Sequence, residues 1–166
     1  MTEDSLRSVT VERISTGHFV ATNARGATIS FGTSAGAPGD TAFTPVELLL
    51  AAIGGCSAAD VDVATSRHAE PTRFSVAVTG AKVSDELGNR MTDLTVTFSV
   101  AFPDGDGDGD GDGDGEDDGV GDGVGEGADR ARAILPRAVK ASHDRLCTVS
   151  RTVETGTPVT VTIEDA

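Results

Sequence analysis

The sequence has no tryptophan, no tyrosine and only six phenylalanines in 166 residues, and its 13 basic residues are outnumbered by 27 acidic ones. Proteins that bind nucleic acids stack bases on aromatic side chains and contact phosphates with clustered lysine and arginine. Both kinds of residue are scarce here, and the formal net charge is −14. The composition therefore excludes a general nucleic-acid binder.

Long apolar runs and a secretory start are also missing. The longest strongly apolar run extends from Leu48 to Ile53, far short of the ~20 apolar residues that a membrane span needs. The first residues, Met1–Ser5, are polar and acidic and lack the basic start and apolar stretch of a signal peptide. We therefore expect a cytoplasmic protein without membrane contact.

Cysteine is limited to Cys56 and Cys147. In a cytosolic protein, two cysteines are more often reactive or simply buried than permanently bridged. The three histidines are scattered and form no pair with the spacing of zinc ligands. We therefore expect neither a structural metal nor a bound cofactor.

Much of the negative charge lies in one stretch. Residues Asp104–Gly127 comprise 11 glycines, 11 acidic residues and two valines, and the rest of the chain has a net charge of only −3. Glycine and repelling carboxylates disfavour regular structure. We therefore expect a single domain over residues 1–166, interrupted by a disordered acidic insert at 104–127. Alternate carboxylates from Asp106 to Asp117 also match part of a calcium-binding EF-hand loop, but Gly113 stands where that loop needs an apolar residue.

The order of expected elements indicates an α+β fold. Alternation of apolar and polar residues predicts strands, whereas helical periodicity and turn residues predict helices and loops. The predicted strands are 8–14, 18–22, 27–31, 73–83, 93–102 and 157–163. The predicted helices are 45–68, 128–143 and 146–154, and the turns are 23–26 and 85–89.

The first predicted helix has the clearest start in the chain. Thr44 can act as its N-cap and Glu47, three residues later, completes a capping box. The first half of this helix is apolar on every side, which predicts burial on every side. Gly54 and Gly55 are costly inside a helix, so another element should approach closely there. A helix of a second subunit would meet both requirements.

Two segments carry a resemblance to a known family. TPVELLLAAIGGCSAADV, which contains Cys56, and LCTVSRTVETGTPV, which contains Cys147, resemble the OsmC/Ohr family of osmotically induced and organic hydroperoxide resistance proteins, in particular its less characterised OsmC-like branch. The two cysteines are 91 positions apart, or 67 without the 24-residue insert, which is close to the family's usual separation. The resemblance implies an OsmC-like fold, with β-sheets wrapped around two long central helices in an intertwined homodimer.

The resemblance also implies a chemistry. In family members that are peroxidases, the cysteine matching Cys56 attacks the O–O bond of an organic hydroperoxide and becomes a sulfenic acid. The cysteine matching Cys147 then condenses with it to a disulfide, which an external dithiol reductant reopens. We therefore expect a thiol-dependent peroxidase without a cofactor, whose partners are a second copy of the chain, a hydroperoxide and a dithiol.

The sequence departs from the hydroperoxide resistance branch near the first cysteine. That branch has a glutamate directly after the helix-start proline, paired with an arginine that activates the cysteine, and Val46 occupies this position here. Glu47 is half a turn away from Cys56 around the helix, so its expected role is capping. Arg25 is a candidate for the arginine, although it does not clearly match.

Two further titratable residues lie near the cysteines. Asp60 follows Cys56 by one helical turn, so its charge should raise the pKa of the thiol unless a cation such as Arg25 or Arg67 offsets it. His143 precedes Cys147 by four residues and either activates it or lies in solvent. These features leave an alternative open, in which the protein is a non-peroxidase dimer that binds a small apolar ligand and the cysteines are partly structural.

Overall fold

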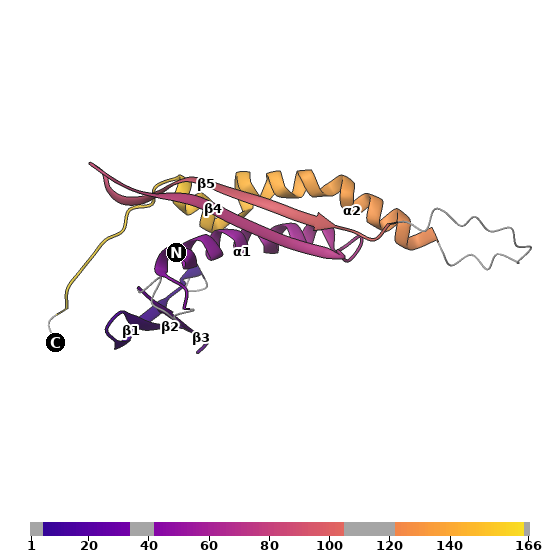
Figure 1. Cartoon of the computed structure of the whole chain (residues 1–166). Coiled ribbons are helices and arrows are strands. Elements are labelled where there is room, and N and C mark those ends of the chain that lie inside the picture. Colours follow the sequence, from indigo (N-terminus) through magenta and orange to yellow (C-terminus); the bar gives the residue numbers. More distant parts are fainter. Residues whose placement is uncertain (1–4, 34–41, 105–121, 165–166) are drawn as a thin grey trace, which may run out of the picture. The chain divides into compact units, whose positions relative to one another are not determined.

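The computed structural model of the chain describes residues 5–33, 42–104 and 122–164 (Figure 1). The chain divides into two compact units, Met1–Ala51 and Ala52–Ala166. Most of the predicted acidic insert, residues 105–121, lies outside the described residues, and the possible calcium loop lies there with it.

The first unit contains a three-stranded antiparallel sheet in the order β1-β2-β3. In the turn between the last two strands, the side-chain oxygen of Asn23 accepts hydrogen bonds from the N–H groups of Arg25 and Ala27, at 2.9 and 3.1 Å. Gly26 takes a φ of 83°, which a side chain would disfavour. The three predicted strands are confirmed as β1 (Val9–Ser15), β2 (His18–Asn23) and β3 (Thr28–Gly32).

Helix α1 (Pro45–Thr65) begins with the predicted capping box. The N–H and hydroxyl groups of Thr44 donate to Glu47 Oε2 at 2.7 and 2.9 Å, and the N–H of Glu47 donates to Thr44 Oγ1 at 3.3 Å. By length and composition alone α1 could cross a membrane, a property that it shares with core helices of soluble proteins.

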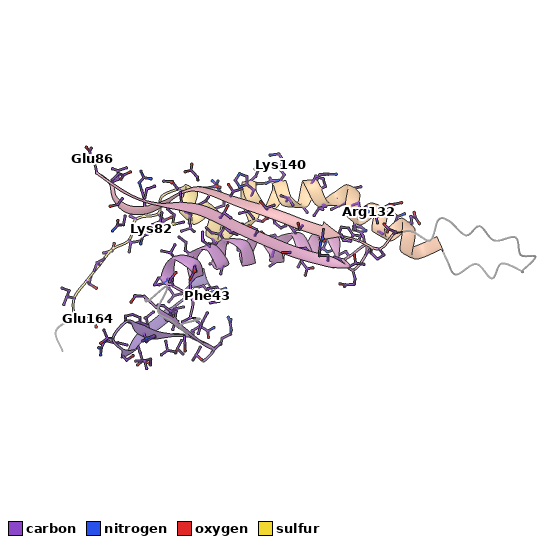
Figure 2. All side chains as sticks on the ribbon, viewed as in Figure 1. Phe43, Lys82, Glu86, Arg132, Lys140 and Glu164 are labelled. Atoms are coloured by element: carbon purple, nitrogen blue, oxygen red, sulfur yellow. The ribbon has the colours of Figure 1, made fainter. Side chains whose placement is uncertain are left out.

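The second unit is built on a long hairpin of β4 (Arg73–Asp85) and β5 (Gly88–Ala101). Its turn consists of two residues, shorter than the predicted 85–89, and Glu86 marks it in Figure 2. The N–H of Leu87 donates to Asp85 Oδ1 at 2.9 Å, and Gly88 has a φ of 93°. Strand β5 begins five residues earlier than predicted, because backbone pairing with β4 extends it through polar residues that show no apolar alternation.

Strand β4 makes the close approach to α1 that the glycine pair predicted. A Cβ atom on Gly54 would lie 2.9 Å from Val78 Cγ2, whereas Gly55 has no neighbour within 4 Å among the described residues. The expectation that another helix approaches Gly54 is thus corrected, since strand β4 of the same chain lies there.

The expected burial of α1 on every side is also not met in the single chain. The buried residues of α1 lie on one face of the helix: Ile53, Gly54, Ser57, Val61 and Thr65.

Helix α2 (Asp122–Ala141) begins six residues earlier than predicted. Residues 122–127, which we assigned to a disordered insert, are therefore helical. The start of α2 packs closely against the segment after α1, because a Cβ on Gly127 would lie 2.4 Å from the carbonyl oxygen of His68. Phe102, Ala128 and Ala131 form a buried core here, and contacts with this core stabilise a helix start that glycine and charge disfavour locally.

The junction between β5 and α2 is held by Arg132, which is labelled in Figure 2. Its guanidinium donates to the carbonyl oxygens of Phe102 and Pro103, at 3.2 and 2.6 Å. It also forms an ion pair with Asp129 on its own helix. The arginine therefore ties the end of β5 to α2, on either side of the acidic stretch.

The end of the described chain differs from the prediction. Residues 157–164 form neither helix nor strand, so the predicted closing strand at 157–163 is absent from the described chain. Val159, Val161 and Ile163 are 87%, 83% and 94% exposed. Alternation predicts which way strand side chains face, but a strand also needs a neighbour for its backbone N–H and C=O groups.

Candidate functional site

Cys147 lies at the junction between two helices of different geometry. Helix α2 continues into a π-helical turn, η2 (Ser142–Leu146), and Cys147 then takes an extended conformation as the N-cap of the short helix α3 (Thr148–Glu154). Its N–H donates to the carbonyl oxygen of Ser142 at 2.9 Å. Wide turns of this kind often occur at functional sites. Here the turn places the Cys147 side chain in the interior, where the residue is 0% exposed.

Hydroxyl and amide groups from two helices surround the sulfur of Cys147. The hydroxyl of Ser57 on α1 donates to Cys147 Sγ at 3.4 Å. On α3, the N–H of Ser150 donates to the same sulfur at 3.4 Å, and the Ser150 hydroxyl lies 3.1 Å from it. The bond from Ser57 joins residues 90 positions apart in the sequence.

Cys56 is half-buried on α1, and both cysteines are free thiols. Burial raises the pKa of Cys56, and interactions with the Cys147 thiol and with the charge of Asp60 raise it further. The N–H of Val149 acts in the opposite direction but does not outweigh them. Cys56 is therefore the member of the pair that more strongly retains its proton.

Cys147 behaves in the opposite way. Burial raises its pKa, but hydrogen bonds with the Ser150 hydroxyl, the Ser57 hydroxyl, the Ser150 N–H and Cys56 lower it by more. The net effect places the pKa of Cys147 below its ordinary value. Hydrogen bonds that favour the charged form outweigh desolvation at this sulfur.

Asp60 acts on Cys56 as the sequence predicted, since its charge contributes to the raised pKa of that thiol. Its partner is a hydroxyl, because the Ser142 side chain, which is buried, donates to Asp60 Oδ2 at 2.8 Å. A hydroxyl leaves the carboxylate with its full charge, so the repulsion of a Cys56 thiolate persists.

A groove of about 600 Å³ adjoins the two serines that bond to Cys147. Its apolar lining includes Ile53, Leu94, Val96, Phe98, Val139 and Val153. Its polar lining includes Ser57 and Ser150, and its charged or titratable lining consists of Lys140, His143, Asp144 and Glu154. The groove therefore offers space for an apolar molecule next to the hydroxyls that contact Cys147.

The other predicted site residues do not join this cluster. Glu47 serves in the capping box, and the N–H and hydroxyl of Thr44 lower the pKa of its carboxyl group. His143 is exposed, and its Nδ1 lies 3.3 Å from Glu154 Oε1, so it pairs with a carboxylate and not with Cys147. Arg25 belongs to the first unit, and its role as a partner of Cys56 stays a prediction.

Sequence reasoning missed the three serines of the site. Ser57 directly follows Cys56, and Ser150 stands three residues after Cys147 in CTVS, the spacing at which an N-cap side chain meets a backbone N–H. That spacing was a usable signal for Ser150. For Ser57 and Ser142, only the tertiary contacts reveal the roles. Among residues 5–33, 42–104 and 122–164, no cluster of three or more potential ligands could hold a metal ion.

Comparisons with known proteins agree with this picture of the fold. Residues 37–109 match the family model described as OsmC-like protein, and no curated protein matches the chain. A crystal structure of a hypothetical protein from Aquifex aeolicus VF5 has a TM-score of 0.62 at 21% identity, over 92% of this chain and 90% of that one. An OsmC-like protein of unknown function from Vibrio cholerae has a TM-score of 0.62 at 14% identity, over 90% and 94%.

A further similar structure carries a functional name. The organic hydroperoxide resistance protein OhrB of Bacillus subtilis has a TM-score of 0.52 at 18% identity, over 89% of this chain and 90% of that one. The predicted resemblance to the OsmC/Ohr family and the predicted α+β, OsmC-like fold are thus confirmed.

Proposed function

We propose that this OsmC-like chain is a thiol-dependent peroxidase that reduces organic hydroperoxides and forms a disulfide between Cys56 and Cys147. The observation that carries the proposal is the pair itself. Two free cysteines from distant parts of the sequence interact with each other, next to serines that line an apolar groove. The similarity to OsmC-like proteins and to a hydroperoxide resistance protein supports it.

The balanced reaction needs one hydroperoxide and both thiols. One sulfur takes the terminal oxygen of the hydroperoxide, the O–O bond breaks, and the alcohol leaves with a proton. The second thiol attacks the sulfenic acid, a disulfide forms, and water leaves. Two electrons pass from sulfur to the peroxide, and an external dithiol returns them. A reducing compartment such as the cytoplasm is where such thiols persist.

The apolar groove supports organic hydroperoxides as substrates. A hydrogen peroxide molecule gains nothing from an apolar wall, whereas an alkyl or aryl group loses water-exposed area when it packs there. Burial contributes about 25 cal/mol for each Å² of apolar surface removed from water. The proposed preference is therefore for peroxides with a sizeable apolar group.

We also propose that the working form is a homodimer. Large apolar side chains are exposed in both units, among them Val9, Val11 and Ile14 on β1 and Val159, Val161 and Ile163 near the C-terminus. Such surfaces commonly mark interfaces. A second copy of the chain would cover them, and it would also supply a neighbour for the extended segment after residue 156.

A thiol titration tests the proposed reaction. The reduced chain, with one equivalent of cumene hydroperoxide, should lose both thiols and form an intramolecular disulfide, which dithiothreitol should reverse. Hydrogen peroxide at the same concentration should react more slowly. Thiols that stay reduced under excess cumene hydroperoxide would disprove peroxidase activity.

The raised pKa of Cys56 and the apolar groove also favour a second candidate, a dimer that binds a small apolar ligand without peroxide chemistry. In that case the cysteines serve packing, and Cys147 is well suited to this because it is fully buried. Native mass spectrometry separates the two functions. A co-purified apolar compound together with thiols inert to peroxide would support binding, whereas turnover with a dithiol would support catalysis.

A further inference from the structure

We propose that the hydrogen bond between Asp60 and Ser142 positions Cys147 for the second step of the reaction. In that step, in the order that the family resemblance implies, Cys147 attacks the oxidised sulfur of Cys56. The inference rests on the proposed peroxidase function and makes Asp60 and Ser142 positioning residues for it.

Ser142 connects two parts of the site through two separate groups. Its hydroxyl donates to Asp60 Oδ2 on α1 at 2.8 Å, and its carbonyl oxygen accepts from the N–H of Cys147 at 2.9 Å. Ser142 is buried, whereas the other four residues of η2 are exposed. A buried hydroxyl needs a partner, and a carboxylate forms a stronger bond with it than a neutral acceptor does. We call this bond the Asp60–Ser142 tether, because it fixes the turn that holds Cys147 to α1.

A second hydrogen bond joins the same two elements beside Cys56. The Ser57 hydroxyl donates to Cys147 Sγ at 3.4 Å. Ser57 directly follows Cys56 on α1, and Asp60 lies one helical turn after Cys56. Two bonds at different points of α1 restrict both sliding and rotation of the Cys147 segment, whereas the bond from Ser57 alone would leave rotation free. Disulfide formation depends on this orientation, because its geometry is narrow.

The charge of Asp60 acts against the first step. It contributes to the raised pKa of Cys56, and the thiolate is the form of cysteine that attacks a peroxide. A neutral acceptor would satisfy the Ser142 hydroxyl without this effect. The carboxylate therefore hinders the first step and strengthens the tether that the second step uses, so the two steps should respond differently to changes at Asp60.

The second step competes with a damaging reaction. The Cys147 thiolate attacks the sulfur of the Cys56 sulfenic acid, the S–S bond forms, the S–O bond breaks, and hydroxide leaves and takes a proton from water. If this attack is slow, a second hydroperoxide oxidises the sulfenic acid to a sulfinic acid, which a dithiol does not reduce. A tether that holds Cys147 in place therefore protects Cys56.

A disulfide probe tests the tether without any peroxide. In the reduced full-length chain, the Cys56 thiolate attacks dithiodipyridine and releases one thiopyridone. Cys147 then attacks the sulfur of Cys56 in the mixed disulfide and releases a second thiopyridone. Stopped-flow absorbance separates the two releases, and the Cys147→Ser variant, which can complete only the first, calibrates them.

Two variants of Asp60 separate its charge from its hydrogen bond. Asp60→Ala removes both, whereas Asp60→Asn removes the charge and keeps an acceptor for Ser142. Both should accelerate the first release, because the Cys56 thiolate loses a repelling charge. Asp60→Ala should slow the second release by roughly tenfold or more, and Asp60→Asn should stay within about threefold of the wild type. Ser142→Ala should slow the second release without accelerating the first, a pattern that a general loss of structure would not give.

Asp62→Ala is the matched control. Asp62 accepts a hydrogen bond from the Ser66 hydroxyl at 2.9 Å near the end of the same helix, so its replacement also removes a carboxylate–serine bond and should leave the second release unchanged. Circular dichroism of each variant reports whether it is folded. If Ser142→Ala does not fold, the comparison of Asp60→Ala with Asp60→Asn decides, because Asp60 is only partly buried.

The outcomes separate this inference from the proposed function. Equal rates of the second release in Asp60→Ala and Asp60→Asn overturn the inference, as does a wild-type chain that releases only one thiopyridone. Thiols that stay reduced under excess cumene hydroperoxide, in a chain that still releases two thiopyridones, overturn peroxidase activity and leave the positioning of Cys147 intact. With hydroperoxide in excess, peptide mass spectrometry should find more sulfinic acid on Cys56 in Asp60→Ala than in Asp60→Asn.

Discussion

The hydroxyl of Ser57 donates a hydrogen bond to Cys147 Sγ, 3.4 Å away, although the two residues are 90 positions apart in the sequence. Ser57 also directly follows Cys56 on α1. The same short segment of helix therefore supplies one thiol of the pair and a hydrogen-bond donor to the other. This arrangement makes the two cysteines unequal, because the donor stabilises a negative charge on Cys147 only.

Ser57→Ala should raise the pKa of the Cys147 thiol, because the Ser57 hydroxyl bonds to that sulfur and lowers its pKa. A hydrogen bond to a charged group contributes about 1.5–3 kcal/mol, so the titration of Cys147 should move to higher pH by about one pH unit or more. Thiolate absorbance in the Cys56→Ser background measures the effect. Ser66→Ala is a matched control, since the Ser66 hydroxyl bonds to Asp62 and not to a cysteine. Equal titration curves for Ser57→Ala and the control would contradict the role of Ser57.

Asp60→Asn should lower the pKa of Cys56. The Asp60 charge raises that pKa, and an amide removes the charge while keeping an oxygen that can accept from Ser142. In the Cys147→Ser background, alkylation of Cys56 by iodoacetamide at pH 7 should therefore become faster. Asp62→Asn changes the same charge on the exposed side of α1 and should have a much smaller effect. A slower alkylation of the Asp60→Asn protein would show that Asp60 does not act through its charge.

Glu47→Ala should destabilise the chain at neutral pH by removing the capping box. The hydrogen bonds from Thr44 lower the pKa of Glu47 in the folded state. Their contribution is fully present above the ordinary value of 4.5 and is lost as the pH falls through the lower folded pKa. The difference in melting temperature between wild type and variant should therefore shrink below pH 4.5. Glu47→Gln, which retains an acceptor, should lie between the two, and a pH-independent difference would contradict this explanation.

Gly54→Ala and Gly55→Ala should have opposite effects on stability. A Cβ on Gly54 would lie 2.9 Å from Val78 Cγ2, and overpacking of this kind costs about 1–3 kcal/mol. Gly55 has no neighbour within 4 Å among the residues that the structure describes, and there Gly→Ala in a helix contributes about 0.5–1 kcal/mol of stability. Urea unfolding measures both changes. Analytical ultracentrifugation adds a second readout for Gly55→Ala, because a weaker dimer would show that a partner helix approaches at this glycine.

Replacement of residues 105–121 by a short neutral linker should leave the thiol chemistry unchanged. Arg132 holds the end of β5 to α2 through contacts with Phe102 and Pro103, and these contacts do not involve the replaced residues. The variant should form the Cys56–Cys147 disulfide at the wild-type rate and keep its oligomeric state by size-exclusion chromatography. Loss of either property would assign the acidic stretch a role beyond solubility.

Local signals in the sequence accounted for much of the fold. The Thr44–Glu47 capping box, the Asn23 turn and the alternating strands of both sheets rest on contacts between residues close in sequence, so the pattern alone predicted them. The predictions were wrong where backbone pairing or packing decides and the side-chain pattern does not encode it. Strand β5 extends through polar residues because they pair with the end of β4 across the hairpin turn, and α2 begins inside the glycine-rich stretch, where Gly127 packs against His68.

The sequence by itself determined most of the elements, the fold class and the identity of the two cysteines, because helix caps, alternation and family motifs are encoded by neighbouring residues. Only the tertiary structure decided which cysteine is the better anion. Ser57 and Ser150 reach Cys147 from two helices, whereas Asp60 opposes the ionisation of Cys56. The physical reason is that a pKa depends on burial, charges and hydrogen-bond donors brought together by folding, and residue spacing along the chain does not specify them.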